Sequence, residues 1–225
     1  MSTRNNGARL LATSSPAAPT AAVLVLHGGS ATSSVAVRRF APAVLRLIPV
    51  AWAIAAHVRS AAVYRLRFSV RGWNGDGVAV LGDARWAIDE IAAAHPGLPI
   101  VVVGHSLGGR VAMHVVGSSS GASTAGDRSR VIGAVGLAPW VDPGDPVDLL
   151  RGVPIAVVQG TKDRIVPERS TRPWLARAAQ AGARIDSTLI DGAGHAMLRH
   201  FRRWHRLASD GVVTVLAAVE QPART

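Results

Sequence analysis

Short apolar runs alternate along the chain with longer alanine-rich stretches, in which apolar residues recur at helical spacing. Several of the short runs are apolar at successive positions, which is typical of strands buried on both faces of a parallel sheet. The alternation predicts βα units and an α/β fold, with helices on both faces of a mostly parallel sheet. Six strands are predicted, at residues 21–27, 62–68, 99–104, 131–138, 154–160 and 184–190.

Helices are predicted in the stretches between these strands, at residues 35–57, 83–95, 109–117, 170–182 and 198–207, with a further one at 211–220. Asp83 and Ser170 are interpreted as N-caps and Gly182 as a C-terminal stop, because these residue types favour those positions. A stretch rich in serine and glycine, residues 118–127, predicts a surface loop.

The most apolar stretch, residues 47–58, does not predict a membrane span. It lies between two arginines, contains Pro49, and is shorter than the roughly 20 residues that a span needs. The first part of the chain also lacks the apolar core of a signal peptide. We therefore expect a cytoplasmic protein with no stable insertion into a membrane.

The chain has 225 residues, of which 48% are hydrophobic and 17% charged, as expected for a single packed domain. Residues 1–20 are predicted to form a flexible N-terminal arm, which leaves residues 21–225 for the domain. The sequence contains no cysteine, so disulfides, thiolate metal sites and cysteine nucleophiles are excluded. Covalent catalysis by this chain would therefore use a serine, a threonine, a lysine or a carboxylate.

The formal net charge of +11 and the sequence pI near 11.7 are typical of proteins that bind nucleic acids. The arginines are, however, spread from Arg4 to Arg224, and no nucleic-acid-reading motif accompanies them. We therefore expect no nucleic-acid partner. The one dense basic cluster, at residues 199–206, is predicted to be the exposed face of a helix.

The sequence GHSLGG, at residues 104–109, places a G-x-S-x-G pattern directly after an apolar strand and directly before a helix. In this context Ser106 is expected to sit in a strained, sharp turn that lifts its hydroxyl off the edge of the sheet. Gly104 and Gly108 then occupy positions where a side chain would collide with the turn, and Gly109 lets the helix pack closely. A phosphate-binding turn is disfavoured, because neither of its usual glycine spacings is present.

A serine hydroxyl is a poor nucleophile at neutral pH and needs a base, a group that orients the base, and donors for an oxyanion. Asp163 and His195 each follow one of the last two predicted strands. Both therefore fall at the carboxyl ends of strands, where open α/β sheets gather their chemistry. Asp142 and Asp145 also follow a predicted strand and are alternatives for the acid, although Asp163 is favoured.

The blocks LHGGS, RGWN, GHSLGG, GTKDRIVP and GAGHAM follow one another in this order from residue 26 to residue 197. With these blocks the chain resembles the α/β-hydrolase family from residue 21 to its C-terminus. The resemblance implies the α/β-hydrolase fold, with Ser106 as the nucleophile, His195 as the general base and Asp163 as the residue that orients the imidazole.

The resemblance also implies an oxyanion hole formed by the backbone N–H groups of Leu107 and Gly29, with Ser30 as the alternative second donor. It implies no metal and no organic cofactor. Ser30, His105 and Trp140 are candidate residues of the substrate pocket, although the turn is expected to direct His105 away from the nucleophile.

Two departures from the family pattern affect the expected shape. Before residue 21, only residues 9–13 offer a further strand, so we expect a sheet of about six strands. The link at residues 139–153 is too short to fold as a cap domain. An open site for a small-molecule acyl substrate is therefore expected.

The predicted function is hydrolysis of carboxylic esters or thioesters through an acyl-enzyme on Ser106. Amide or peptide cleavage and perhydrolysis use the same three residues and remain alternatives. A non-catalytic member of the fold that binds a small ligand is a further alternative, since a fold does not determine an activity.

Overall fold

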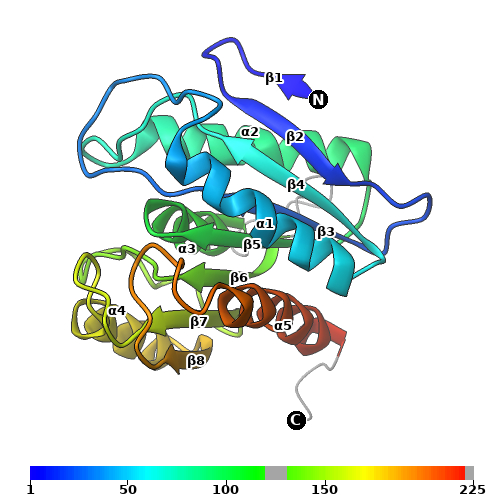
Figure 1. The fold of residues 1–225 in the computed structure, drawn as a ribbon. Helices are drawn as coiled ribbons and strands as arrows, with labels where there is room; N and C mark the ends of the chain where they lie inside the picture. The colour runs from blue at the N-terminus through cyan, green and yellow to red at the C-terminus, as the bar shows by residue number, and fades with distance from the viewer. Residues whose placement is uncertain (120–130, 221–225) are drawn as a thin grey trace.

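The computed structural model of the protein describes residues 1–119 and 131–220. In this part of the chain, eight strands form one sheet, and five helices cover it (Figure 1). The strands are β1 (Ser2–Thr3), β2 (Arg9–Ser14), β3 (Ala21–Leu26), β4 (Ala61–Arg67), β5 (Ile100–His105), β6 (Val131–Leu137), β7 (Pro154–Gly160) and β8 (Arg184–Ile190). The helices are α1 (Pro42–His57), α2 (Val78–Ala94), α3 (Leu107–Ser119), α4 (Glu168–Gln180) and α5 (Phe201–Glu220).

The sheet has the order β1-β2-β4-β3-β5-β6-β7-β8, and its strands from β4 to β8 are parallel. The chain passes from β3 to β4 on one side and then returns to place β5 on the other side of β3. In such folds ligands usually bind at the carboxyl ends of the two strands on either side of this reversal, which here are β3 and β5. The predicted α/β class and mostly parallel sheet are confirmed.

Two layers of helices explain why the central strands are apolar at successive positions. Helices α1 and α5 pack on one face of the sheet, and α2, α3 and α4 pack on the other. Every residue of β3, β5 and β7 is therefore buried. This burial agrees with the six predicted strands, all of which are present within one residue at each end.

The prediction of a flexible arm at residues 1–20 is wrong, and so is the prediction of about six strands. Strand β2 pairs antiparallel with β4, and β1 pairs with β2, so the sheet has eight strands. Leu10 lies opposite Leu66 in this pairing, and both Leu10 and Ala8 are buried. The arm is therefore part of the sheet, because its few apolar side chains complete the core beside α2.

Asp83 is not the N-cap that was predicted, because α2 begins five residues earlier at Val78. Its buried carboxylate instead joins three parts of the chain. One oxygen accepts hydrogen bonds from Arg4 and Asn6, at 2.9 and 2.7 Å. The other accepts them from the backbone N–H and the hydroxyl of Ser69, at 2.7 and 2.6 Å. Asp83 thus holds the N-terminal strands and the segment after β4 against α2.

Other helix boundaries also differ from the predicted ones. Helix α1 begins at Pro42 rather than at residue 35, and Ser170 lies inside α4, whose N-cap is Pro167. Gly182 does follow the end of α4 with a φ of +92°, as its assignment as a stop requires. The two predicted C-terminal helices are one continuous helix, α5.

The link from β6 to β7, at residues 138–153, contains turns and bends but no helix, as its length predicted. Most of the predicted surface loop at 118–127 falls outside the described residues. Among the described helices, none is both long and apolar enough to cross a bilayer.

Candidate active site

Ser106 occupies the sharp turn between β5 and α3. Its φ of +54° lies in the left-handed region, which is strained for any residue with a side chain. A Cβ atom on Gly104 would collide with the carbonyl oxygen of Gly108. One on Gly108 would lie 2.5 Å from the carbonyl oxygen of Leu26, and one on Gly109 would lie 2.7 Å from Pro139 Cβ. These contacts confirm the prediction that a side chain at any of the three glycines would collide with its surroundings.

The structure brings Ser106, His195 and Asp163 together at the carboxyl ends of β5, β8 and β7. The Ser106 Oγ atom lies 3.0 Å from His195 Nε2, and His195 Nδ1 lies 2.7 Å from Asp163 Oδ2. Because an ionised carboxylate only accepts hydrogen bonds, Nδ1 carries the proton and Nε2 accepts from the serine hydroxyl. The three side chains thus form a continuous chain of hydrogen bonds that ends at a serine oxygen.

Two turns must lie side by side for His195 to reach Asp163. After β7, the Lys162 N–H donates to the carbonyl oxygen of Ala193, at 2.9 Å, in the turn after β8. Gly160 permits this approach, since a Cβ atom there would collide with the same carbonyl oxygen. The Thr161 hydroxyl adds a hydrogen bond to the Asp191 carboxylate at 3.0 Å. Local backbone packing therefore fixes the distance between the acid and the histidine.

Asp163 is held as a carboxylate. Burial acts to raise its pKa, but the hydrogen bond with His195 and the N–H groups of Val166 and Ile165 outweigh burial and keep the pKa below its ordinary value. The alternative acid Asp145 is engaged elsewhere, since it forms a bidentate ion pair with Arg110, and Asp142 is exposed. Geometry therefore favours Asp163 among the three aspartates considered.

The loop after β3 lies against the turn at Ser106. The His27 Nδ1–H donates to the carbonyl oxygen of Gly28 at 2.7 Å, and its Nε2 accepts from the Phe68 N–H at 3.1 Å, so His27 fixes the start of this loop. A Cβ atom on Gly29 would collide with the Arg71 carbonyl oxygen and would lie 3.2 Å from the Leu107 side chain. Only a glycine fits this close approach.

Gly29 and Ser30, the two candidates for the second donor of the oxyanion hole, differ in whether the backbone N–H is already hydrogen-bonded. The Ser30 N–H already donates to the Arg71 carbonyl oxygen at 3.0 Å, which favours Gly29 over Ser30. Leu107 is the first residue of α3, so its N–H is one of those that helix geometry leaves without an intrahelical acceptor. Leu107 and Gly29 therefore remain the pair that the site supports best.

Comparisons with known proteins agree with this architecture. A family model described as serine aminopeptidase, S33, matches residues 57–153, a segment that includes Ser106 and ends before Asp163. No curated protein matches the sequence at a significant level.

Solved structures match over nearly the whole chain. An α/β serine hydrolase homologue from Coxiella burnetii has a TM-score of 0.68 at 15% identity, with 94% of this chain and 95% of that chain covered. The apo form of Thermogutta terrifontis esterase 2 has a TM-score of 0.69 at 19% identity, with 95% and 92% covered. An acetyl ester-xyloside bifunctional hydrolase from Caldicellulosiruptor lactoaceticus has a TM-score of 0.65 at 16% identity, with 94% and 89% covered. The chain has the α/β-hydrolase fold.

In this α/β-hydrolase fold, His105 does not line a substrate pocket as the sequence predicted. It is only 2% exposed and lies behind the turn, where its Nε2–H donates to the carbonyl oxygen of His195 at 2.9 Å. Burial and the neighbouring His195 lower the pKa of His105 to about 3, so its ring stays neutral. His105 therefore ties the backbone of the His195 loop to the turn that carries Ser106. The one feature of the sequence that points to this structural role is that His105 comes directly before Ser106.

Arg110 forms a second cluster that the sequence did not indicate. Its guanidinium lies between the rings of Trp73 and Trp140, at 4.2 and 4.9 Å from their centres, while it pairs with Asp145. The backbone N–H groups of Arg110 and Trp140 both donate to the Ser106 carbonyl oxygen, at 3.1 and 3.0 Å. This places the half-buried Trp140 beside the turn that carries Ser106, with one ring face covered by Arg110; its role as a substrate-pocket residue stays a prediction.

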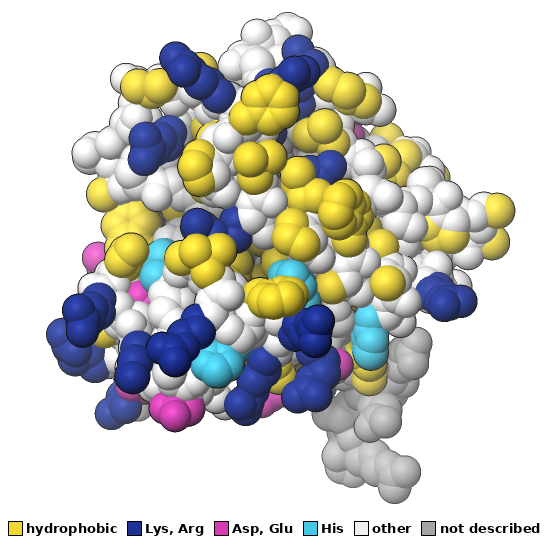
Figure 2. Space-filling model, viewed as in Figure 1, with side chains coloured by type: hydrophobic (Ala, Val, Ile, Leu, Met, Phe, Trp, Pro, Cys, Tyr) yellow, Lys and Arg dark blue, Asp and Glu magenta, His cyan; other side chains and the backbone are white. Residues whose placement is uncertain are grey.

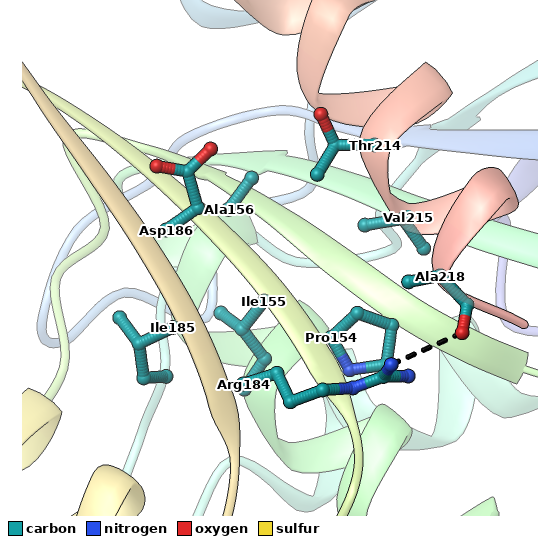
Figure 3. Close-up of a pocket in the computed structure, with 9 residues that line it drawn as sticks. All are labelled: Pro154, Ile155, Ala156, Arg184, Ile185, Asp186, Thr214, Val215 and Ala218. Atoms are coloured by element: carbon teal, nitrogen blue, oxygen red, sulfur yellow. Dashed lines mark hydrogen bonds between the residues drawn. The ribbon is translucent and has the colours of Figure 1, made fainter. Parts of the chain in front are cut away.

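The pocket shown in Figure 3 lies away from this site. It has a volume of 180 Å³ and lies between α5 and the first residues of β7 and β8. Arg184 crosses it to donate to the carbonyl oxygen of Ala218 at 3.1 Å. Because it opens at the amino ends of the strands, it is at the opposite edge of the sheet from Ser106.

Two buried neutral histidines are expected to make the protein sensitive to mild acid. Burial lowers the pKa of His27 to about 4, and that of His105 to about 3. Below about pH 6.5 the unfolded chain therefore binds two protons that the folded chain does not, and stability falls as the pH falls. The free energy of unfolding should drop by up to about 4 kcal/mol between pH 7 and pH 5.

Urea unfolding at pH 7 and pH 5 measures this loss, and a His105→Gln variant provides the control. Glutamine keeps an N–H for the His195 carbonyl but does not titrate, so the loss should fall to about half. The lowered pKa of Asp163 acts only below about pH 4, outside this interval. Equal losses in the two proteins would contradict the assignment of His105.

Proposed function

We propose that the protein is a serine hydrolase that cleaves carboxylic esters or thioesters through an acyl-enzyme on Ser106. The observation that carries this proposal is the hydrogen-bonded chain from Ser106 Oγ through His195 to Asp163, with links of 3.0 and 2.7 Å. A serine joined in this way to a neutral imidazole has the base and the orienting group that nucleophilic catalysis needs.

In the first half of the reaction, His195 Nε2 takes the hydroxyl proton while Ser106 Oγ attacks the acyl carbon. The oxygen of the tetrahedral intermediate then faces the N–H groups of Leu107 and Gly29, which stabilise its charge. Asp163 stabilises the imidazolium that forms. The intermediate collapses when Nε2–H protonates the leaving alcohol or thiol, and the acyl group stays on Ser106.

In the second half, a water molecule gives a proton to Nε2 and attacks the acyl carbon. Collapse of the second tetrahedral intermediate releases the carboxylic acid and returns the proton to Ser106 Oγ. Every proton is carried by His195, so these steps call for no metal and no organic cofactor. The link at residues 138–153 has no helix, which supports a small or extended acyl substrate rather than one enclosed by a cap.

Cleavage of amides or peptides is the second candidate, because the matching family model is described as that of a serine aminopeptidase. Two of the structural neighbours are titled esterases or ester hydrolases, which supports the ester reading. The same machinery serves both bonds, so a substrate panel separates them. We expect turnover of p-nitrophenyl acetate and none of aminoacyl p-nitroanilides.

A fluorophosphonate probe tests the proposal without knowledge of the substrate. Such a reagent phosphonylates a serine only where a base and an oxyanion hole are assembled. We expect one adduct, located on Ser106 by peptide mass mapping, and none on a Ser106→Ala variant with an unchanged circular dichroism spectrum. A folded wild-type protein without an adduct on Ser106 would overturn the proposal in favour of a non-catalytic, ligand-binding protein.

A further inference from the structure

The outer face of α1 is apolar where a surface helix is ordinarily polar. Leu45, Ile48, Pro49 and Trp52 follow one another at the helical spacing of three and four residues. Leu45 and Trp52 are exposed, the latter by 61%, and the two between them are half-buried. The opposite side of the same helix already fills the core, so this stripe has no role in packing the sheet.

The apolar surface extends beyond α1 toward the active site. Phe40, two residues before α1, is 65% exposed, and Leu198, in the loop between His195 and α5, is 73% exposed. Phe201, the first residue of α5, is exposed as well. Helices α1 and α5 pack together on the same face of the sheet, and Figure 2 shows hydrophobic side chains gathered over this face. We call this surface, from Phe40 to Phe201, the α1 face.

Arginines surround the α1 face and acidic residues are scarce. The first 75 residues contain nine arginines and no aspartate or glutamate. Four of these nine lie in α1 or close to its ends, and four more arginines lie at the start of α5, which packs against α1. The two groups are Arg38, Arg39, Arg46 and Arg59, and Arg199, Arg202, Arg203 and Arg206. Figure 2 shows Lys and Arg side chains around the hydrophobic ones on this face, with few carboxylates between them. The nearest acid in α5, Asp210, is engaged by His57 and Arg206.

We infer that the α1 face binds reversibly to an anionic lipid surface. An apolar stripe with a tryptophan, bordered by arginines, combines the two forces that hold peripheral proteins at a bilayer. These are burial of apolar area among the acyl chains and attraction of cations to anionic headgroups. The face lies along the sides of α1 and α5, so the protein would rest on the lipid surface with these two helices against it.

Two other occupants fit the face less well. A second copy of the chain would bring two sets of arginines together, and like charges opposite one another disfavour that pairing. A nucleic acid would satisfy the arginines but would leave Leu45 and Trp52 against phosphates, where an apolar stripe gains nothing. The combination of apolar centre and basic border favours lipid.

Binding at this face goes beyond the proposed reaction, because it needs no turnover. It would place the lipid surface next to Leu198, three residues after His195. Acyl chains leaving or entering that surface would then meet the site along its open side. The test uses a Ser106→Ala protein, so that its outcome is independent of whether the protein is a hydrolase.

The experiment is sedimentation of this protein with vesicles of phosphatidylcholine alone and with vesicles that also contain phosphatidylglycerol. We expect binding to the anionic vesicles only. Replacing Arg202, Arg203 and Arg206 by glutamine should lower the partition coefficient roughly a hundredfold. Trp52→Glu should lower it about tenfold or more, since it removes apolar area and adds a like charge to that of the headgroups.

Matched control variants carry the same changes on the opposite face of the sheet. Val78→Glu alters an equally exposed apolar residue, at 69%, in α2, and a triple change of Arg85, Arg169 and Arg172 to glutamine removes the same charge from α2 and α4. Both controls should bind like the parent. Absence of vesicle binding, equal losses in the control and test variants, or a solution dimer that Trp52→Glu dissociates would each overturn the inference. Binding of duplex DNA that is insensitive to Trp52→Glu and displaces the vesicles would overturn it too.

Discussion

Replacing Asp163 by asparagine is expected to lower kcat for ester hydrolysis by about ten thousandfold while the fold is retained. Asp163 Oδ2 holds the proton of His195 on Nδ1 across 2.7 Å. An asparagine presents an amide that also donates, which favours the imidazole tautomer with its proton on Nε2. That tautomer is unable to accept the proton of the Ser106 hydroxyl, and no charge remains to stabilise the imidazolium.

Steady-state kinetics of p-nitrophenyl acetate hydrolysis, with kcat and KM measured separately, check this expectation. Asp145→Asn is the matched control, because Asp145 was the rival acid and is buried to a similar degree. Its loss should reduce stability through the unpaired Arg110 and leave kcat within about tenfold of wild type. If Asp145→Asn lowered kcat more than Asp163→Asn, the assignment of the acid would be wrong.

An alanine at Gly108 is expected to prevent formation of the native turn, with a loss of at least about 3 kcal/mol of stability. The added Cβ atom would lie 2.5 and 2.6 Å from the carbonyl oxygens of Leu26 and His27. Both neighbours are backbone atoms at the end of a central strand, so neither can rotate away. Helix α3 would have to move off β3, and this would open the core beneath the site.

Gly194→Ala is the matched control, since this glycine also lies in a loop of the site and precedes His195. The nearest atom to a Cβ there is the Lys162 carbonyl oxygen at 3.8 Å, which is an ordinary contact. Thermal unfolding should therefore give a Tm close to that of the wild type for Gly194→Ala. A Gly108→Ala protein that unfolds at the same temperature would show that the turn can relax, contrary to the expectation.

The central strands, which the sequence predicted correctly, share one physical property. Strands such as β3 and β5 are buried on both faces, so each position must be apolar and the run is visible in the sequence. Strand β2 lies near an edge and is buried only at Leu10, so its sequence RLLATS gives no comparable run. Its place is set instead by pairing with β4 and by contacts to a distant aspartate, which a local pattern does not contain.

Helix ends were predicted less well for a similar reason. Asp83 has the residue type of an N-cap, yet its carboxylate is used for tertiary hydrogen bonds to Ser69 and Arg4. Gly211 has the residue type of a helix stop, yet it lies inside α5 where a Cβ atom would be within 3.4 Å of Val135 and Ala156. In both cases contacts with distant parts of the chain place the residue inside a helix, although its local preference is for a helix end.

The candidate site was more predictable than the edges of the sheet, because serine-hydrolase chemistry fixes the residue types and the α/β-hydrolase fold fixes their order along the chain. Ser106, Asp163 and His195 each follow a strand that was predicted from the sequence. The choice between Gly29 and Ser30 needed the structure, since it depends on which N–H is already bonded to Arg71. The role of His105 also needed it, because its partner is a backbone oxygen of His195 rather than a side chain.

The pairing of β2 with β4 affects the order in which parts of the protein fold during synthesis. Residues 9–14 leave the ribosome early, yet the strand with which β2 pairs ends at Arg67. Asp83, the partner of Arg4, is synthesised later still, because it lies 79 residues further along the chain. This segment therefore remains without its partners until β4 and α2 have emerged, and we expect it to be among the last parts of the sheet to form.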